Sequence, residues 1–193
     1  MNKPVSILFV GVGGQGTILA SKILTEALLE KGYDVKMTEV HGMAQRGGSV
    51  TTEVRFGEKV YSPLIEKGDA DVIVAFEKSE AVRYLSYLKK SGIIVANDYE
   101  IYPVTVTIGE EKYPENVDEN LQKTVPNTYI IKAAKLAEDL GNIKAQNVVL
   151  LGALVSALNL TGIHWENVIE RLVPVKAAEL NKKAFKLGYE SLK

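Results

Sequence analysis

Cysteine is absent from this sequence of 193 residues. A chain without cysteine cannot form a disulfide, supply a thiolate nucleophile or ligate an iron–sulfur cluster through cysteine. Histidine is scarce as well, because only His41 and His164 occur and they lie far apart in the chain. This scarcity argues against a zinc site. We therefore expect any electron-transfer chemistry that involves the chain to take place on another molecule.

A strong charge of either sign is also missing. The sequence has 23 Lys and Arg residues against 24 Asp and Glu residues, a net charge of −1, which disfavours nucleic acid and anionic membranes as partners. No apolar run approaches the roughly 18 residues of a membrane span, and the first residues show no signal-peptide cleavage pattern. With 46% hydrophobic and 24% charged residues, the composition is that of a soluble globular protein. We expect one cytoplasmic domain over residues 1–193.

A glycine-rich turn near the N-terminus is the most informative segment. Gly11-Val12-Gly13-Gly14-Gln15-Gly16 follows the apolar run Pro4–Val10, which predicts a buried strand, and precedes Thr17–Leu29, which predicts an amphipathic helix. Such a turn presents backbone N–H groups at the positive end of the helix dipole, where anions bind. Its glycine spacing fits the dinucleotide-binding fingerprint, which is a weak signal by itself. The predicted cofactor-binding residues of this turn are Gly11, Gly13, Gly14, Gln15, Gly16 and Thr17. A turn that serves only helix–strand packing is the alternative.

The chain then departs from the usual dinucleotide-binding pattern. Only eight residues separate the predicted second strand, Asp34–Val40, from the next, Ser49–Phe56, and eight are too few for a crossover helix. The strict alternation of Ser49–Phe56 predicts a half-exposed antiparallel strand. Gly57-Glu58 fits a two-residue turn into a return strand, Lys59–Ser62. A β-hairpin is therefore expected where a second crossover helix would lie.

Alternation of strands and helices resumes after this hairpin. A helix is expected at Ala145–Leu160, apolar on all sides and therefore fully buried. The pattern as a whole predicts a Rossmann-like three-layer α/β/α fold with a mixed sheet, an inserted β-hairpin and C-terminal helices. The other predicted strands are Asp71–Phe76, Gly92–Ala96, Pro103–Ile108 and Thr128–Ile131, and the other predicted helices are Ser79–Lys90, Lys132–Asp139, Trp165–Leu172 and a last helix that begins at Pro174.

A second glycine-rich segment follows the predicted second strand. It carries polar side chains at the carboxyl end of that strand, and ligands bind at this end of an open α/β sheet. We expect it to line the same crevice as the first glycine turn, where the two could hold an anionic ligand or the backbone of another subunit. Packing alone is again the alternative. The predicted cofactor-binding residues here are His41, Gln45, Arg46, Gly47 and Gly48.

A dinucleotide-dependent enzyme is a different interpretation of the same residues. Glu39 lies about where an acid would bind the ribose hydroxyls of NAD. The inserted hairpin, however, removes the second half of the nucleotide-binding unit, and no set of acid, base and hydride-site residues stands out. Glu77 and Asn97 follow strands and are expected to cap a helix or a turn. A stand-alone nucleotide-binding protein or NAD-dependent dehydrogenase remains the alternative function.

Two long motifs resemble a known family. Gly11–Thr17, followed by Glu39-Val40-His41-Gly42-Met43-Ala44-Gln45-Arg46-Gly47-Gly48-Ser49-Val50, is similar to the gamma-type subunit of the 2-oxoacid:ferredoxin oxidoreductases. The form His41–Ser49 most resembles the small (beta) subunit of the indolepyruvate ferredoxin oxidoreductases. Tyr61–Ile65, Ala75–Glu77 and Asn181–Tyr189 are similar too, so the resemblance runs nearly end to end.

The resemblance implies a subunit of an anaerobic enzyme. In such enzymes a 2-oxoacid, here an indolepyruvate or another arylpyruvate, is decarboxylated on thiamine diphosphate, electrons pass through 4Fe–4S clusters to ferredoxin, and the acyl group passes to coenzyme A. Thiamine diphosphate and clusters belong to a larger partner subunit, which also meets ferredoxin, in agreement with the absence of cysteine here. The resemblance thus implies a small non-redox subunit that binds no cofactor alone, supplies no catalytic residue and is inactive in isolation. A contribution to coenzyme A binding is a hypothesis.

Overall fold

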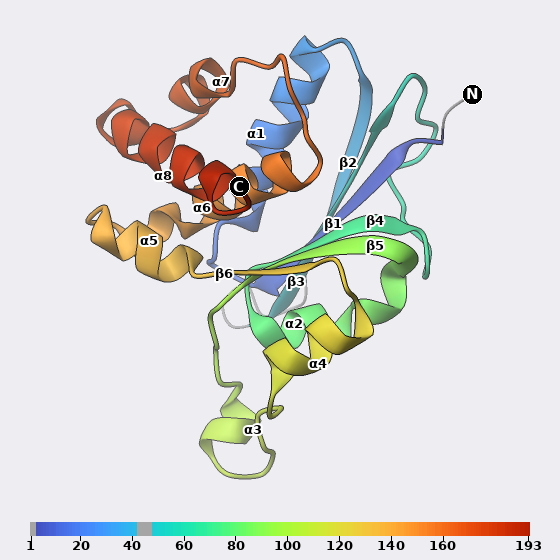
Figure 1. Ribbon diagram of the computed structural model, residues 1–193, viewed down its shortest axis with the longest axis vertical. Helices are drawn as coiled ribbons and strands as arrows, with labels where there is room; N and C mark the ends of the chain where they lie inside the picture. Colours follow the sequence, from blue (N-terminus) through green and yellow to red (C-terminus); the bar gives the residue numbers. More distant parts are fainter. Residues whose placement is uncertain (1–2, 42–47) are drawn as a thin grey trace.

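A mixed six-stranded sheet in the order β2-β3-β1-β4-β5-β6 organises the chain (Figure 1). The computed structural model describes residues 3–41 and 48–193. Strands β1, β4, β5 and β6 run parallel, whereas β3 is antiparallel to both of its neighbours, β1 and β2. The strands are β1 Val5–Val12, β2 Asp34–His41, β3 Ser49–Gly57, β4 Ala70–Ala75, β5 Leu88–Asn97 and β6 Thr128–Ile131.

Strand β3 is inserted between β1 and β2, which confirms the predicted antiparallel strand. The predicted return strand Lys59–Ser62 is wrong, because the hairpin is formed by β2 and β3 instead. Strand β3 pairs with β2 along one edge and with β1 along the other, so neither edge is left for a return strand. Arg55 donates to the carbonyls of Ser62 and Leu64 at 3.3 and 3.1 Å, and Glu53 Oε2 accepts from the Ile65 N–H at 2.5 Å.

Five helices cover one face of the sheet, and they include the C-terminal helices expected from the sequence (Figure 1). The predicted fully buried helix is confirmed as α6, in which Val148, Val149, Leu150 and Leu151 are all completely buried. Burying one such side chain stabilises a fold by roughly 1.5–3 kcal/mol. No helix in the described part of the chain is long and apolar enough to cross a membrane. The five helices are α1 Thr17–Glu30, α5 Ala133–Asp139, α6 Gln146–Ala157, α7 Trp165–Leu172 and α8 Ala178–Glu190.

The opposite face carries a thinner cover of two short helices, α2 Lys78–Arg83 and α4 Val117–Thr124. Leu121 of α4 packs in a second apolar cluster with Leu8 of β1 and Ile73 of β4. A further short helix, α3 Val104–Thr107, projects beyond α2 and α4 (Figure 1). The predicted three-layer α/β/α arrangement is confirmed.

Two other predicted elements are wrong. The helix expected over Ser79–Lys90 ends at Arg83, because Leu88 pairs with Ala70 and the chain is already part of β5. The strand expected over Pro103–Ile108 is the helix α3. The Thr105 carbonyl there accepts the N–H groups of Glu110 and Glu111, so the chain closes into a turn instead of extending. Helix α4 had no counterpart among the predicted elements.

Candidate functional site

The glycine turn joins β1 to α1 at the carboxyl edge of the parallel strands, as predicted. Gly14 and Gly16 have φ angles of 101° and 83°, in the left-handed region that glycine occupies without strain. Gly14 is exposed, and a Cβ built there would meet nothing within 4 Å. At Gly16 a Cβ would lie 3.1 Å from Cγ of Asn147 in α6, so this glycine permits close packing of two helices. Gly14 thus leaves the turn open to solvent at the start of α1.

Gln15 braces the turn from beneath. Its side-chain Oε1 accepts from the Val12 N–H at 2.8 Å, and its Nε2 donates to the Phe76 carbonyl at 2.9 Å. Gly11 lies directly against this amide, since a Cβ there would be 2.9 Å from Oε1 of Gln15 and 2.9 Å from Cβ of Phe76. Thr17 is buried as well. The side chains of the turn therefore hold its shape, and its exposed surface is backbone.

The N-terminus of helix α1 has no side chain that caps it or neutralises its partial positive charge. Gly16 at the N-cap offers no side-chain acceptor, and no acidic residue lies in the first turn. An α-helix carries roughly half a positive charge at this end, and its first N–H groups have no partner within the helix. The arrangement suits an anion such as a phosphate. The described residues of the turn, 11–17, carry no charged side chain, and their arrangement supports binding of an anion.

The second glycine segment meets the first at a backbone hydrogen bond, in which Gly13 N donates to the Gly48 carbonyl at 2.9 Å. His41 ends β2, opposite Val50 of β3. The predicted site residues Gln45, Arg46 and Gly47 lie outside the described residues. The structure thus brings the two glycine segments together at Gly13 and Gly48.

Ser49, which follows Gly48, ties this region to α2. Its hydroxyl donates to Oε2 of Glu80 at 2.5 Å and lies 3.3 Å from the hydroxyl of Tyr84. Glu80 is almost fully buried, and its Oε1 accepts from Nε of Arg83 at 2.8 Å. The start of β3 is therefore fixed to α2 on the thinly covered face.

Glu77 and Asn97 act as caps, which confirms the interpretation drawn from their positions after strands. The Glu77 carboxylate caps α2 by accepting from the Glu80 N–H at 3.0 Å. Asn97 Oδ1 accepts from the N–H groups of Ala133 and Ala134 at the start of α5, at 3.1 and 3.4 Å. Both side chains are completely buried.

Sequence reasoning missed the amides of Gln146 and Asn147, which connect α6 to the site. Asn147 Nδ2 donates to the Gly16 carbonyl at 3.2 Å, and Gln146 Oε1 accepts from Asn97 Nδ2 at 2.8 Å. Two adjacent amides at the start of an otherwise apolar helix were the signal, because buried amides require partners.

Next to these caps, the ammonium group of Lys78 lies close to three carboxylates. Its Nζ lies 2.6 Å from Asp98, 2.8 Å from Asp118 and 3.7 Å from Glu100. Burial lowers the pKa of Lys78, but hydrogen bonds to Asp118 and Asp98 outweigh it, so the pKa is raised. Burial, followed by the hydrogen bond to Glu77, raises the pKa of the Tyr113 hydroxyl. These groups keep their protons at neutral pH and act structurally.

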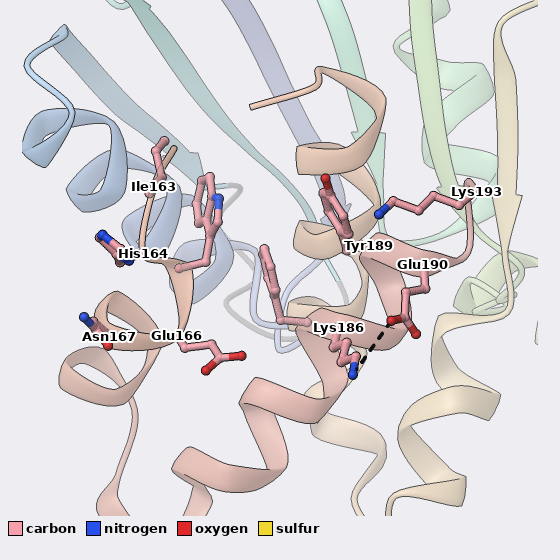
Figure 2. Close-up of a pocket in the computed structure, with 10 residues that line it drawn as sticks. Ile163, His164, Glu166, Asn167, Lys186, Tyr189, Glu190 and Lys193 are labelled. Atoms are coloured by element: carbon pink, nitrogen blue, oxygen red, sulfur yellow. Dashed lines mark ion pairs between the residues drawn. The ribbon is translucent and has the colours of Figure 1, made fainter. Parts of the chain in front are cut away.

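A separate cavity of about 460 Å³ lies between α7 and α8 (Figure 2). Acidic and basic side chains alternate around it, including Glu166 and the pair Lys186–Glu190, whose charged atoms are 3.9 Å apart. None of its lining residues belongs to a glycine segment. Its balanced charge gives no preference for an anion.

The sheet order also bears on the NAD interpretation. In a dinucleotide-binding fold the acid that binds the ribose lies on the strand beside β1. Here β3 separates β2, and with it Glu39, from β1, so two strand spacings of about 4.8 Å lie between them. Glu39 is thus displaced from the ribose position.

The architecture is that of a Rossmann-like domain whose glycine turn lies at the carboxyl edge of the parallel strands. Residues 6–191 match the model of the pyruvate ferredoxin/flavodoxin oxidoreductase family. The chain belongs to this family, as a gamma-type small subunit of a 2-oxoacid:ferredoxin oxidoreductase. The stand-alone dehydrogenase interpretation is not supported.

Individual relatives agree along nearly the whole chain. The chain is 43% identical over 196 residues to the indolepyruvate oxidoreductase subunit IorB of Pyrococcus horikoshii, covering 99% of this chain and 97% of that subunit. The crystal structure of a keto/oxoacid ferredoxin oxidoreductase gamma subunit from Geobacter sulfurreducens has a TM-score of 0.72 at 26% identity, covering 97% of both chains.

A third comparison shows the same fold inside a longer polypeptide. The 2-oxoglutarate:ferredoxin oxidoreductase from Magnetococcus marinus, solved with 2-oxoglutarate, coenzyme A and succinyl-CoA bound, has a TM-score of 0.72 at 22% identity. The match covers 99% of this chain but only 31% of that one. In that enzyme the fold is therefore one part of a chain about three times as long.

Proposed function

We propose that the chain is the small non-redox subunit of an indolepyruvate or arylpyruvate ferredoxin oxidoreductase and that its glycine turn binds phosphate groups of coenzyme A. The likeness to indolepyruvate oxidoreductase subunits supports the substrate class. The observation that carries the binding role is the open start of α1, where Gly14 is exposed and the first turn has neither a side-chain cap nor a carboxylate.

In the proposed enzyme the two subunits carry different groups. The 4Fe–4S clusters lie on a larger partner subunit, since this sequence contains no cysteine to ligate them, and thiamine diphosphate is proposed to lie on the same partner. Thiamine diphosphate supplies the decarboxylation chemistry there, and ferredoxin is reduced through the partner. Coenzyme A is the co-substrate, and its phosphates meet the two glycine segments, including Arg46. The assembly works in the cytoplasm, and the small subunit alone is inactive.

The test is a coenzyme A titration of the reconstituted holoenzyme carrying Gly14→Ala. The added methyl group strains a residue at φ 101° and intrudes on the exposed backbone. We expect the Michaelis constant for coenzyme A to rise about tenfold, the equivalent of one lost contact of about 1.4 kcal/mol. Arg46→Ala is expected to raise it as well.

Gly32→Ala is the matched control, because Gly32 follows the opposite end of α1, has a φ of 93°, and has equal space for a Cβ. We expect both variants to lose a similar amount of stability, so a difference in the Michaelis constant between them reports binding. An unchanged Michaelis constant in both Gly14→Ala and Arg46→Ala would contradict coenzyme A binding. If subunit affinity falls instead, the turn contacts the partner.

A further inference from the structure

Residues 99–116, called here the α3 arm, leave the sheet after β5 and return at α4. The arm projects from the body of the molecule (Figure 1). Three of its apolar side chains face solvent, with exposed fractions of 59% for Tyr102, 74% for Val104 and 61% for Ile108. Apolar side chains that gather on one exposed surface often mark an interaction site.

The α3 arm is ordered by its own hydrogen bonds. Thr105 Oγ1 donates to Glu111 Oε2 at 2.7 Å, and the Thr105 carbonyl accepts from the N–H groups of Glu110 and Glu111 at 2.9 and 3.1 Å. Tyr102 and Tyr113 pack edge to face with ring centroids 5.1 Å apart. These contacts order the arm, which lowers the entropy cost of binding a partner.

Buried groups of the site anchor the base of the α3 arm. Tyr113 donates a hydrogen bond to Glu77, and the Ile101 N–H donates to the same carboxylate at 3.3 Å. Lys78 holds Asp98 before the arm and Asp118 after it. A cavity of about 270 Å³ between α2 and the arm, with Val82 and Val106 in its lining, extends the apolar surface.

The charge of the α3 arm indicates the kind of surface that it binds. Four glutamates lie within it, Glu100, Glu110, Glu111 and Glu115, against one lysine, Lys112. An apolar tip with an acidic rim fits an apolar groove rimmed by Lys or Arg, since complementary charge steers association.

We propose that the α3 arm docks into such a groove on the larger subunit of the oxidoreductase, an inference that rests on the proposed function. The arm leaves from the carboxyl end of β5, the edge that also carries the glycine turn after the parallel strand β1. Docking there brings the turn against the partner. The fold of this chain also forms 31% of the Magnetococcus polypeptide, so a much larger protein mass accompanies the same domain in that enzyme.

The experiment co-expresses the chain with the tagged larger subunit encoded in the same genome and measures the dissociation constant of the purified pair. Val104→Glu with Ile108→Glu is the test variant, and Val175→Glu, at a residue that is 92% exposed outside the α3 arm, is the control. We expect the double variant to bind on the order of 30-fold more weakly, as for the loss of a central interface contact, and the control to match the wild type. Thermal unfolding of each chain alone should be unchanged.

Each outcome is decisive. Equal affinity of the double variant and the wild type would overturn docking by the α3 arm while leaving the proposed function intact. Failure of the wild-type chain to bind the larger subunit would overturn the proposed function and, with it, the docking inference. Dimerisation of the isolated chain in sedimentation, lost in the double variant, would assign the arm to self-association instead.

Discussion

Gly188 of α8 lies directly on the backbone of Val149 in α6, so that a Cβ at Gly188 would be 2.7 Å from the Val149 carbonyl carbon. The contact is reciprocal, because a Cβ at Gly152 of α6 would be 2.8 Å from the Tyr189 nitrogen. The two helices therefore touch through their backbones at two glycines.

Gly188→Ala should destabilise the chain. Replacing a glycine inside a helix by alanine ordinarily stabilises the helix by about 1 kcal/mol. At Gly188 we expect destabilisation instead, because the added methyl group overpacks the contact between the helices. We expect the free energy of unfolding in urea to fall by about 2 kcal/mol or more. Lys183→Ala, at an exposed position of the same helix, should change it by less than about 0.5 kcal/mol. A neutral or stabilising Gly188→Ala would show that α8 shifts freely on α6.

Tyr113→Phe should loosen the base of the α3 arm. It removes the hydroxyl that Glu77 binds inside the protein and leaves that buried carboxylate oxygen short of a donor. We expect a loss of about 2 kcal/mol of unfolding free energy and faster proteolysis within residues 99–116. Tyr102→Phe is the control, because its hydroxyl meets Glu100 at the surface at 3.1 Å. Equal behaviour of the two variants would argue against Glu77 as the anchor.

Gln15→Glu should destabilise the glycine turn in a pH-dependent manner. The variant keeps an acceptor for Val12 but directs a buried carboxylate at the Phe76 carbonyl, so its folded-state pKa should lie above the ordinary value. The penalty of about 1–3 kcal/mol is then full at neutral pH and diminishes on acidification, when the protonated acid can donate. Gln15→Leu loses both bonds, and its penalty should not vary with pH. Parallel pH profiles of the two variants would refute the bracing role.

Glu53→Gln should change how stability depends on pH. Burial raises the pKa of Glu53 above its ordinary value of 4.5, although the Ile65 N–H and Arg55 oppose the shift. The folded state therefore holds the proton more tightly, and this group lowers stability as pH rises from about 4.5 through its folded-state pKa. The glutamine variant keeps the acceptor without titrating. Urea unfolding between about pH 4 and pH 7 should show the variant gaining stability relative to wild type. A constant difference would exclude the shift.

The sequence predicted elements whose burial is continuous or whose turns require glycine. β1 and α6 were predicted because their apolar runs are continuous, and α1 because its apolar residues recur at helical spacing after a glycine-rich turn. The local sequence pattern gave a wrong prediction where side chains distant in the sequence determine the secondary structure. Val104-Thr105-Val106-Thr107 alternates like a strand, but Tyr113 and Glu111 fold it into the α3 arm.

The position of the candidate site could be predicted from the sequence, but its hydrogen-bond network could not. The glycine segments and the caps follow from positions after strands. Gln15 bonds to Phe76, which is 61 positions away in the chain, and Asn147 bonds to Gly16, which is 131 positions away. Lys78 bonds to Asp118, 40 positions away. No local spacing in the sequence reveals these pairs.

The placement of β3 between β1 and β2 has a consequence for assembly on the ribosome. β1 is the first strand to be synthesised, yet both of its neighbours in the sheet, β3 and β4, emerge later than α1 and β2. β2 and β3 are consecutive and can close on each other with little loss of chain entropy, whereas β1 must wait for them. We expect nascent chains that stop before β3 to leave the apolar β1 unpaired and in need of a chaperone.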